Sequence, residues 1–149
     1  MHINLNVRID RSTPEVFAFV TEPSNAALIY PGARIIAESP GQLGPGTRYQ
    51  IVIERPRRAP VIRDCTVLEY DANRRLVTQV DTASGGRLID EVDFMSEGGS
   101  TLVRYSSRTV PTGFFSRIVL SLMVFWKPTI RRHIQTQFDR IRIQLECGA

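Results

Sequence analysis

The sequence predicts an α+β fold in which a curved antiparallel sheet of seven strands holds one long C-terminal helix. Residues 2–9 alternate between polar and apolar side chains, which is typical of a strand with one buried face. Six further strand candidates are separated by turn-forming residues, and short turns favour antiparallel neighbours. A helical stripe of apolar residues near the C-terminus provides the element that the sheet would wrap.

Two short helices are expected after the first strand. Ser12 and Glu15 have the spacing of a capping box, and Pro14 suits a first helical turn. Residues 22–25 break this helix, and residues 25–30 can form a second one. The later strands are predicted over residues 33–38, 48–54, 61–70, 76–82, 87–95 and 101–108, with residues 55–60 as a loop.

The C-terminal stripe recurs at spacings of three and four residues, as on one face of a helix. It consists of Ile130, Ile134, Phe138, Ile141 and Leu145. The preceding run, 118–126, is uncharged. Because Pro128 cannot donate an N–H and clashes with the preceding turn, a kink or break is predicted near 126–128.

The composition is that of one globular domain over residues 1–149, with 42% hydrophobic and 23% charged residues. Cys65 and Cys147 are far apart and belong to no CxxC pattern, so no disulfide or metal site is predicted and a reducing cytoplasm is expected. No dinucleotide or phosphate-binding glycine motif occurs, so no cofactor is predicted.

The formal net charge of +4 permits an anionic partner, although solvated arginines explain it more simply. The basic loop at 55–58 has no interleaved aromatic residues, so no nucleic-acid partner is predicted. The uncharged run at 118–126 is shorter than the roughly 20 residues needed to span a bilayer, and the N-terminus has no signal pattern.

Three segments resemble the START-like SRPBCC superfamily, and within it the polyketide cyclase/dehydrase and lipid-transport family. Residues 9–23, IDRSTPEVFAFVTEP, are similar to that family's first strand and helix. Residues 44–49, GPGTRY, are similar to the turn that opens its third strand, and residues 94–103, FMSEGGSTLV, to its final hairpin. The resemblance implies a helix-grip fold with a cavity between sheet and helix, which in relatives holds lipids, sterols, quinones or polyketides.

Strand parity predicts which polar side chains face such a cavity. If Phe94 points inward, so does Asp90, and the same reasoning places Arg63 with Cys65 and Tyr105 with its strand's apolar face. A carboxyl in an apolar pocket suits general acid or base catalysis, and an arginine beside it can bind a substrate carboxylate or enolate. Asp90, Arg63 and Tyr105 are therefore the candidate catalytic residues.

Three alternatives stay open for these residues. Asp90 and Arg63 can simply pair, a bulge can turn either outward, and a one-residue slip would place Glu91 or Asp93 inside instead. His133 has no carboxylate at helical spacing and is expected at the surface. The candidate ligand contacts are Tyr49, Ile51, Cys65, Thr78, Phe94, Met123, Trp126 and Ile130.

Three functions are compatible with this pattern. The first is binding of a small hydrophobic ligand such as a lipid, quinone or polyketide-like molecule, and the second is a cyclase or dehydratase that uses the cavity carboxylate. The third is a homodimer or peripheral membrane contact through the apolar segment 114–126, which basic residues flank. Most of that segment is expected in the core, with Phe114 and Phe115 as its exposed residues.

Overall fold

The computed structural model describes residues 2–37, 43–82, 86–111, 113, 114, 118 and 126–147. Its helical elements are α1 (Thr13–Thr21), the 3-10 helix η1 (Pro23–Asn25), α2 (Ala26–Ile29) and α4 (Lys127–Cys147). Its strands are β1 (His2–Ile9), β2 (Ala33–Ala37), β3 (Arg48–Arg55), β4 (Arg58–Asp71), β5 (Arg75–Asp81), β6 (Arg87–Glu97) and β7 (Ser100–Val110).

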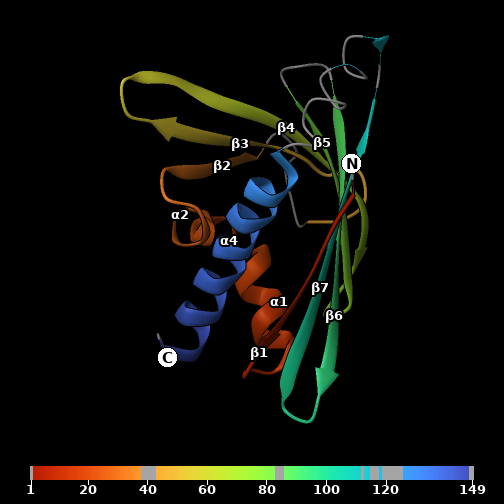
Figure 1. Cartoon of the computed structure of the whole chain (residues 1–149). Coiled ribbons are helices and arrows are strands. Elements are labelled where there is room, and N and C mark those ends of the chain that lie inside the picture. The colour runs from red at the N-terminus through yellow and green to blue at the C-terminus, as the bar shows by residue number, and fades with distance from the viewer. Residues whose placement is uncertain are drawn as a thin grey trace.

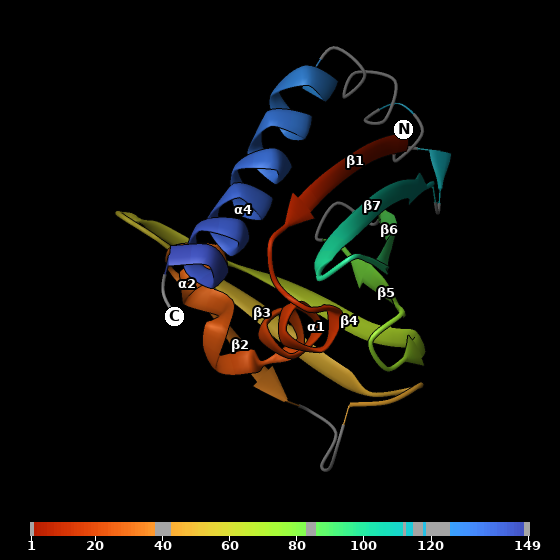
Figure 2. The same ribbon diagram turned by 90° about the horizontal axis from the view of Figure 1, so that it is seen from below.

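The strands form one seven-stranded antiparallel sheet in the order β1-β7-β6-β5-β4-β3-β2, which confirms the predicted fold class. The first strand therefore pairs with the last, while every other neighbour is a hairpin or simple connection. The sheet curves, and its concave side faces the helices (Figures 1 and 2). Helix α4 crosses that concave side and contacts β1, α1 and α2.

The predicted loop at residues 55–60 is wrong. Strand β3 continues to Arg55 and β4 begins at Arg58, so a tight turn joins them, with Arg57 at φ 57°. Pro60 has no backbone N–H to donate to a neighbouring strand. It is tolerated because β4 pairs with β5 only from Asp64 onward, so at Pro60 there is no second strand to accept a hydrogen bond.

The predicted stripe of α4 is confirmed as the helix's inner face. Phe138 and Ile141 are buried, and Ile130, Ile134 and Leu145 pack against the same core. The alternating apolar residues of β1 complete this core from the sheet side, together with Phe17 and Val16 of α1. Burial on both sides fixes the position of α4 over the sheet.

Both ends of α4 have identifiable causes. The helix begins at Lys127, with Pro128 in its first turn, where a missing N–H costs no helical bond. The predicted kink or break near 126–128 stays a prediction, because residues 119–125 lie outside the described residues. At the other end, the Arg11 guanidinium donates to the Leu145 and Glu146 carbonyl oxygens (2.8 and 3.4 Å), which satisfies terminal acceptors of the helix.

Candidate functional site

A cavity of about 620 Å³ lies between the concave face of the sheet and helices α2 and α4. Volumes of about 300–1,000 Å³ are typical of small-molecule sites. Aliphatic side chains form most of its wall, from both the strands and the helices. Their residues are Ile3, Val20, Ala26, Ile29, Ala33, Ile35, Ile51, Ile53, Val80, Leu88, Ile130 and Ile134.

Gly32 positions the part of the chain that leads from α2 into the cavity wall. Its φ of +85° is a left-handed conformation, and a Cβ there would lie 2.8 Å from the Glu54 carbonyl oxygen. The Glu54 N–H donates to the Gly32 carbonyl at 2.9 Å, so the backbones are in direct contact. This close approach places Tyr30 and Ala33 against the cavity.

Asp90, Tyr105 and Ser107 form a polar cluster on the sheet side of the cavity. Asp90 pairs in register with Ser107 across β6 and β7, and the Tyr105 hydroxyl donates to Asp90 Oδ1 at 3.1 Å. Burial raises the pKa of the Asp90 carboxyl, against the opposing effects of hydrogen bonds from Ser107 and Tyr105 and of the Arg63 charge. Burial, and then the neighbouring Asp90, also raise the pKa of Tyr105.

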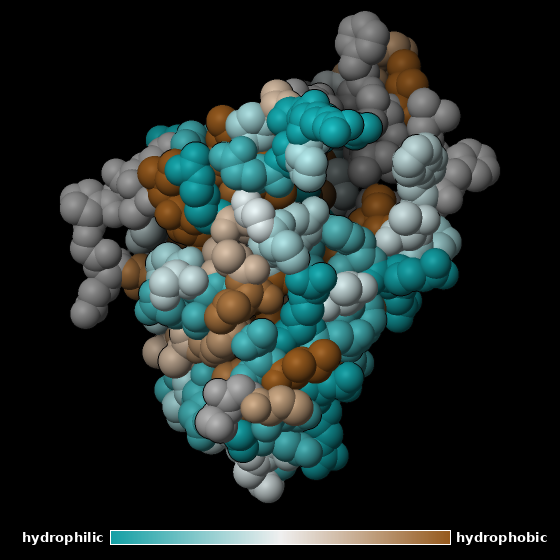
Figure 3. All heavy atoms as spheres, turned by 90° about the vertical axis from the view of Figure 1, so that its left-hand side faces the viewer, coloured by the Kyte–Doolittle hydropathy of each residue, from teal (hydrophilic) through white to brown (hydrophobic). Residues whose placement is uncertain are grey.

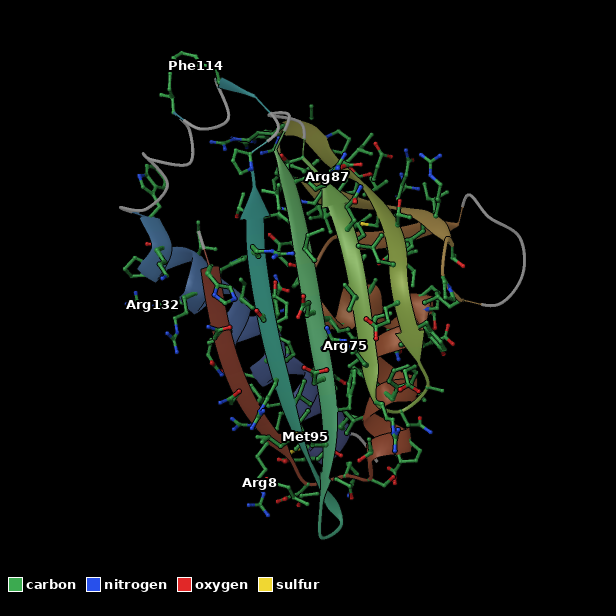
Figure 4. All side chains as sticks on the ribbon, turned by 90° about the vertical axis from the view of Figure 1, so that its right-hand side faces the viewer. Arg8, Arg75, Arg87, Met95, Phe114 and Arg132 are labelled. Atoms are coloured by element: carbon green, nitrogen blue, oxygen red, sulfur yellow. The ribbon has the colours of Figure 1, made fainter. Side chains whose placement is uncertain are left out.

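The strand register shows which of the three acids Asp90, Glu91 and Asp93 faces the cavity. Glu91 and Asp93 project from the outer face, where Arg75 binds both, at 3.2 and 2.8 Å. Arg75 also binds Glu69 at 3.2 Å, so this one guanidinium meets three carboxylates near the middle of the outer face (Figure 4). The alternative of a one-residue slip is therefore excluded, and Asp90 is the acid of β6 that faces the cavity.

Arg63 lines the cavity but remains exposed to solvent, which places it at the mouth. No ion pair joins it to Asp90 or to any other acid in the described part of the chain. Its charge nevertheless lowers the pKa of Asp90 and that of Tyr105, and all three groups line one cavity. The structure thus brings together all three candidate catalytic residues without directly pairing the acid with the arginine.

Among the candidate ligand contacts, Ile51 and Ile130 line the cavity, whereas Tyr49, Cys65 and Thr78 do not. These three lie together in the sheet, because Tyr49 pairs in register with Cys65, and both Cys65 and Thr78 influence the pKa of Tyr49. Burial raises the pKa of the Cys65 thiol to about 12, so this thiol is neutral and unreactive at ordinary pH.

The remaining candidate contacts lie elsewhere. Phe94 does not line the cavity, because its ring packs edge-on against Phe17 in the core, with centroids 5.1 Å apart. Met123 lies outside the described residues. Trp126 is 67% exposed and Phe114 is 75% exposed, the latter beyond the edge of the sheet (Figure 4). Phe115 also lies outside the described residues.

The helices contribute polar groups to the cavity that the sequence interpretation did not include. His133 is exposed, as expected, but it also lines the cavity, and its ring meets Tyr30 edge-on at 5.2 Å. Gln137 lies one turn further along α4 and lines the same wall. On the sheet side, Ser107 and Thr109 also line the cavity. Alternate residues of a strand share a face, so they lie on the same face of β7 as Tyr105, and counting two and four residues on from Tyr105 would have identified them.

The fold defines the chain as a helix-grip α+β protein. A scan against protein-family models found no match, and neither did a search of curated proteins. Among solved structures, a protein of unknown function from Staphylococcus aureus is similar with a TM-score of 0.75 and 13% identity, covering 99% of this chain and 96% of that one. A protein from Mesorhizobium loti is similar with a TM-score of 0.73 and 12% identity, covering 100% and 99%. Ara h 8.0201 is similar with a TM-score of 0.69 and 9% identity, covering 95% and 97%.

At such identities, the likeness shows the shared fold alone. In the described part of the chain, no helix has both the length and the apolar character that crossing a membrane requires. On the face that carries α2 and α4, polar side chains divide the apolar ones into small groups (Figure 3). The cavity is therefore the candidate functional site of the described structure.

Proposed function

We propose that the protein binds a small hydrophobic ligand in the cavity between the sheet and α4. The observation that carries this proposal is the cavity itself: its volume is about 620 Å³ and most of its lining surface is apolar. A solvent-accessible cavity with mostly apolar walls exposes these walls to water, so covering them with an apolar ligand is favourable. The resemblance to the lipid-transport family supports the same ligand class.

The first test is native mass spectrometry of protein purified without delipidation. We expect a bound apolar molecule at close to one per chain, because a ligand that fills aliphatic walls removes apolar surface from water. Leu88→Trp should fill the cavity and lower ligand occupancy at least about tenfold, since Leu88 forms part of its wall.

The matched control is Ile62→Trp. Ile62 is 50% exposed and precedes Arg63 on β4, so its larger replacement projects from the other face of the sheet. Ligand occupancy should be unchanged in this variant. A wild-type protein that carries no ligand and does not bind a neutral apolar dye at micromolar concentration would contradict the proposal.

A second candidate function is acid–base catalysis on a bound molecule, which the Asp90–Tyr105 hydrogen bond favours. Burial raises the pKa of Asp90, and a carboxyl with a raised pKa can donate a proton to a substrate carbonyl. If a cavity ligand is converted, Asp90→Asn should retain binding and lose turnover by about 100-fold or more. Unchanged turnover in this variant would remove Asp90 from the mechanism.

A further inference from the structure

We propose that the cavity selects hydrophobic molecules that end in a carboxylate, with that carboxylate bound by Arg63 at the mouth. The ligand class is then a fatty-acid-like monocarboxylate, whose hydrocarbon portion lies along the aliphatic walls. This inference rests on the proposed function, because it names the chemistry of the ligand for the same cavity.

Arg63 projects its guanidinium from the concave face of the sheet. Its register partner on β3 is Ile51, which also lines the cavity, so Arg63 projects from the concave face. Arg63 lines the same cavity as Asp90 and Tyr105, and its charge lowers the pKa of both groups. A guanidinium in this position can donate two parallel hydrogen bonds to a carboxylate, the geometry that arginine suits best.

The described acids of the cavity form no ion pair with Arg63. Asp90 forms no ion pair with Arg63, and burial, which raises the pKa of Asp90, disfavours its ionised form. Glu22 already accepts hydrogen bonds from the Ser24 N–H and hydroxyl at 3.2 and 3.0 Å, as the cap of η1. The cavity therefore presents one cation that is without an anionic partner among the described residues.

Part of the cavity wall is purely aliphatic, although Tyr30, His133 and Gln137 line the helix side as well. The wall formed by Ile29, Ile35, Ile53 and Ile134 offers no hydrogen-bonding side chain, which suits a hydrocarbon. A ligand without a charged end would gain the same contacts along this wall but would leave Arg63 bound only to water. The arginine thus adds a preference for an acid over its neutral analogue, on top of the affinity that burial provides.

The experiment compares lauric acid with methyl laurate as competitors of the neutral dye Nile red. For the wild-type protein, we expect laurate to bind about tenfold or more tightly than its methyl ester, because charge-assisted hydrogen bonds are the stronger ones. Arg63→Gln should abolish this preference and leave the affinity for methyl laurate unchanged. Arg104→Gln is the matched control, since Arg104 is exposed on the outer face one residue before Tyr105.

The outcomes separate this inference from the function on which it rests. If Arg63→Gln keeps the preference for laurate, or loses both competitors equally, Arg63 does not select the charge and the inference is wrong. If Arg104→Gln also loses the preference, net charge rather than the site causes it, and the inference is again wrong. If the dye binds but neither molecule displaces it from the wild-type protein, the cavity does not take fatty-acid-like ligands and the inference is wrong. A wild-type protein that does not bind Nile red at all would instead contradict the proposed hydrophobic binding.

Discussion

Phe138→Ala is expected to lower the free energy of unfolding by about 3–5 kcal/mol, the range for removing a buried aromatic ring. Phe138 is 7% exposed and belongs to the core cluster that joins α4 to β1. Its ring also lies 5.3 Å from that of Tyr105, so it supports a cavity residue as well as the core. Urea denaturation followed by far-UV circular dichroism would measure the loss.

Ile143→Ala is the control on the same helix. Ile143 is 54% exposed, and its removal leaves no cavity, so the change should stay within about 0.5 kcal/mol. A loss below about 1 kcal/mol for Phe138→Ala would mean that α4 is held elsewhere, for example by Arg11 at its C-terminal end. The comparison thus tests which contacts fix the helix that covers the cavity.

The fold could be predicted because its main elements carry local patterns that burial enforces. In β1, every second residue is buried, as the alternation in the sequence indicates. In α4, the predicted stripe faces the core because a helix with one apolar face is stable only when that face is covered. Parity also placed Asp90 and Tyr105 on one face correctly, since the period of a strand is two.

The cavity itself depends on packing between distant segments, which local patterns do not contain. Tyr49 and Ile51 share a face of β3, yet only Ile51 lines the cavity, because Tyr49 is engaged by Thr78 and Cys65. Tyr30 and His133 meet across α2 and α4 although about 100 residues of chain separate them. The prediction of a loop at residues 55–60 was wrong for a different reason. The tight turn there has Arg57 at a left-handed φ, a position where glycine is the usual sequence signal of such a turn.

Asp90→Asn is expected to raise the free energy of unfolding at neutral pH by on the order of 1 kcal/mol, the scale of a single buried polar interaction. The carboxamide keeps the shape of the side chain and can still accept the hydrogen bond from Tyr105. The substitution removes the free-energy cost of having an ionised carboxylate in the folded protein, where burial disfavours the charge. Urea denaturation across a pH series would measure the difference.

The sign of the pH dependence follows from proton binding. The folded protein holds the Asp90 proton to a higher pH than the unfolded chain, because burial raises the pKa in the folded state. The contribution of Asp90 to the free energy of unfolding is therefore fully present below about pH 4, the ordinary pKa of an aspartate. It is lost as the pH rises through the pKa of Asp90 in the folded state. The stability advantage of Asp90→Asn should accordingly vanish in acid and grow toward neutral pH.

Asp93→Asn gives the opposite sign and serves as the control. Asp93 lies on the outer face and binds Arg75 at 2.8 Å, so its neutralisation should lower stability by up to about 1 kcal/mol. If Asp90→Asn instead lowers stability at neutral pH, the ionised carboxylate is favoured inside the cavity, and Arg63 is the nearby cation that would stabilise it. Such a carboxylate would compete with any ligand acid for Arg63, so the same measurement bears directly on whether this cavity prefers an anionic ligand.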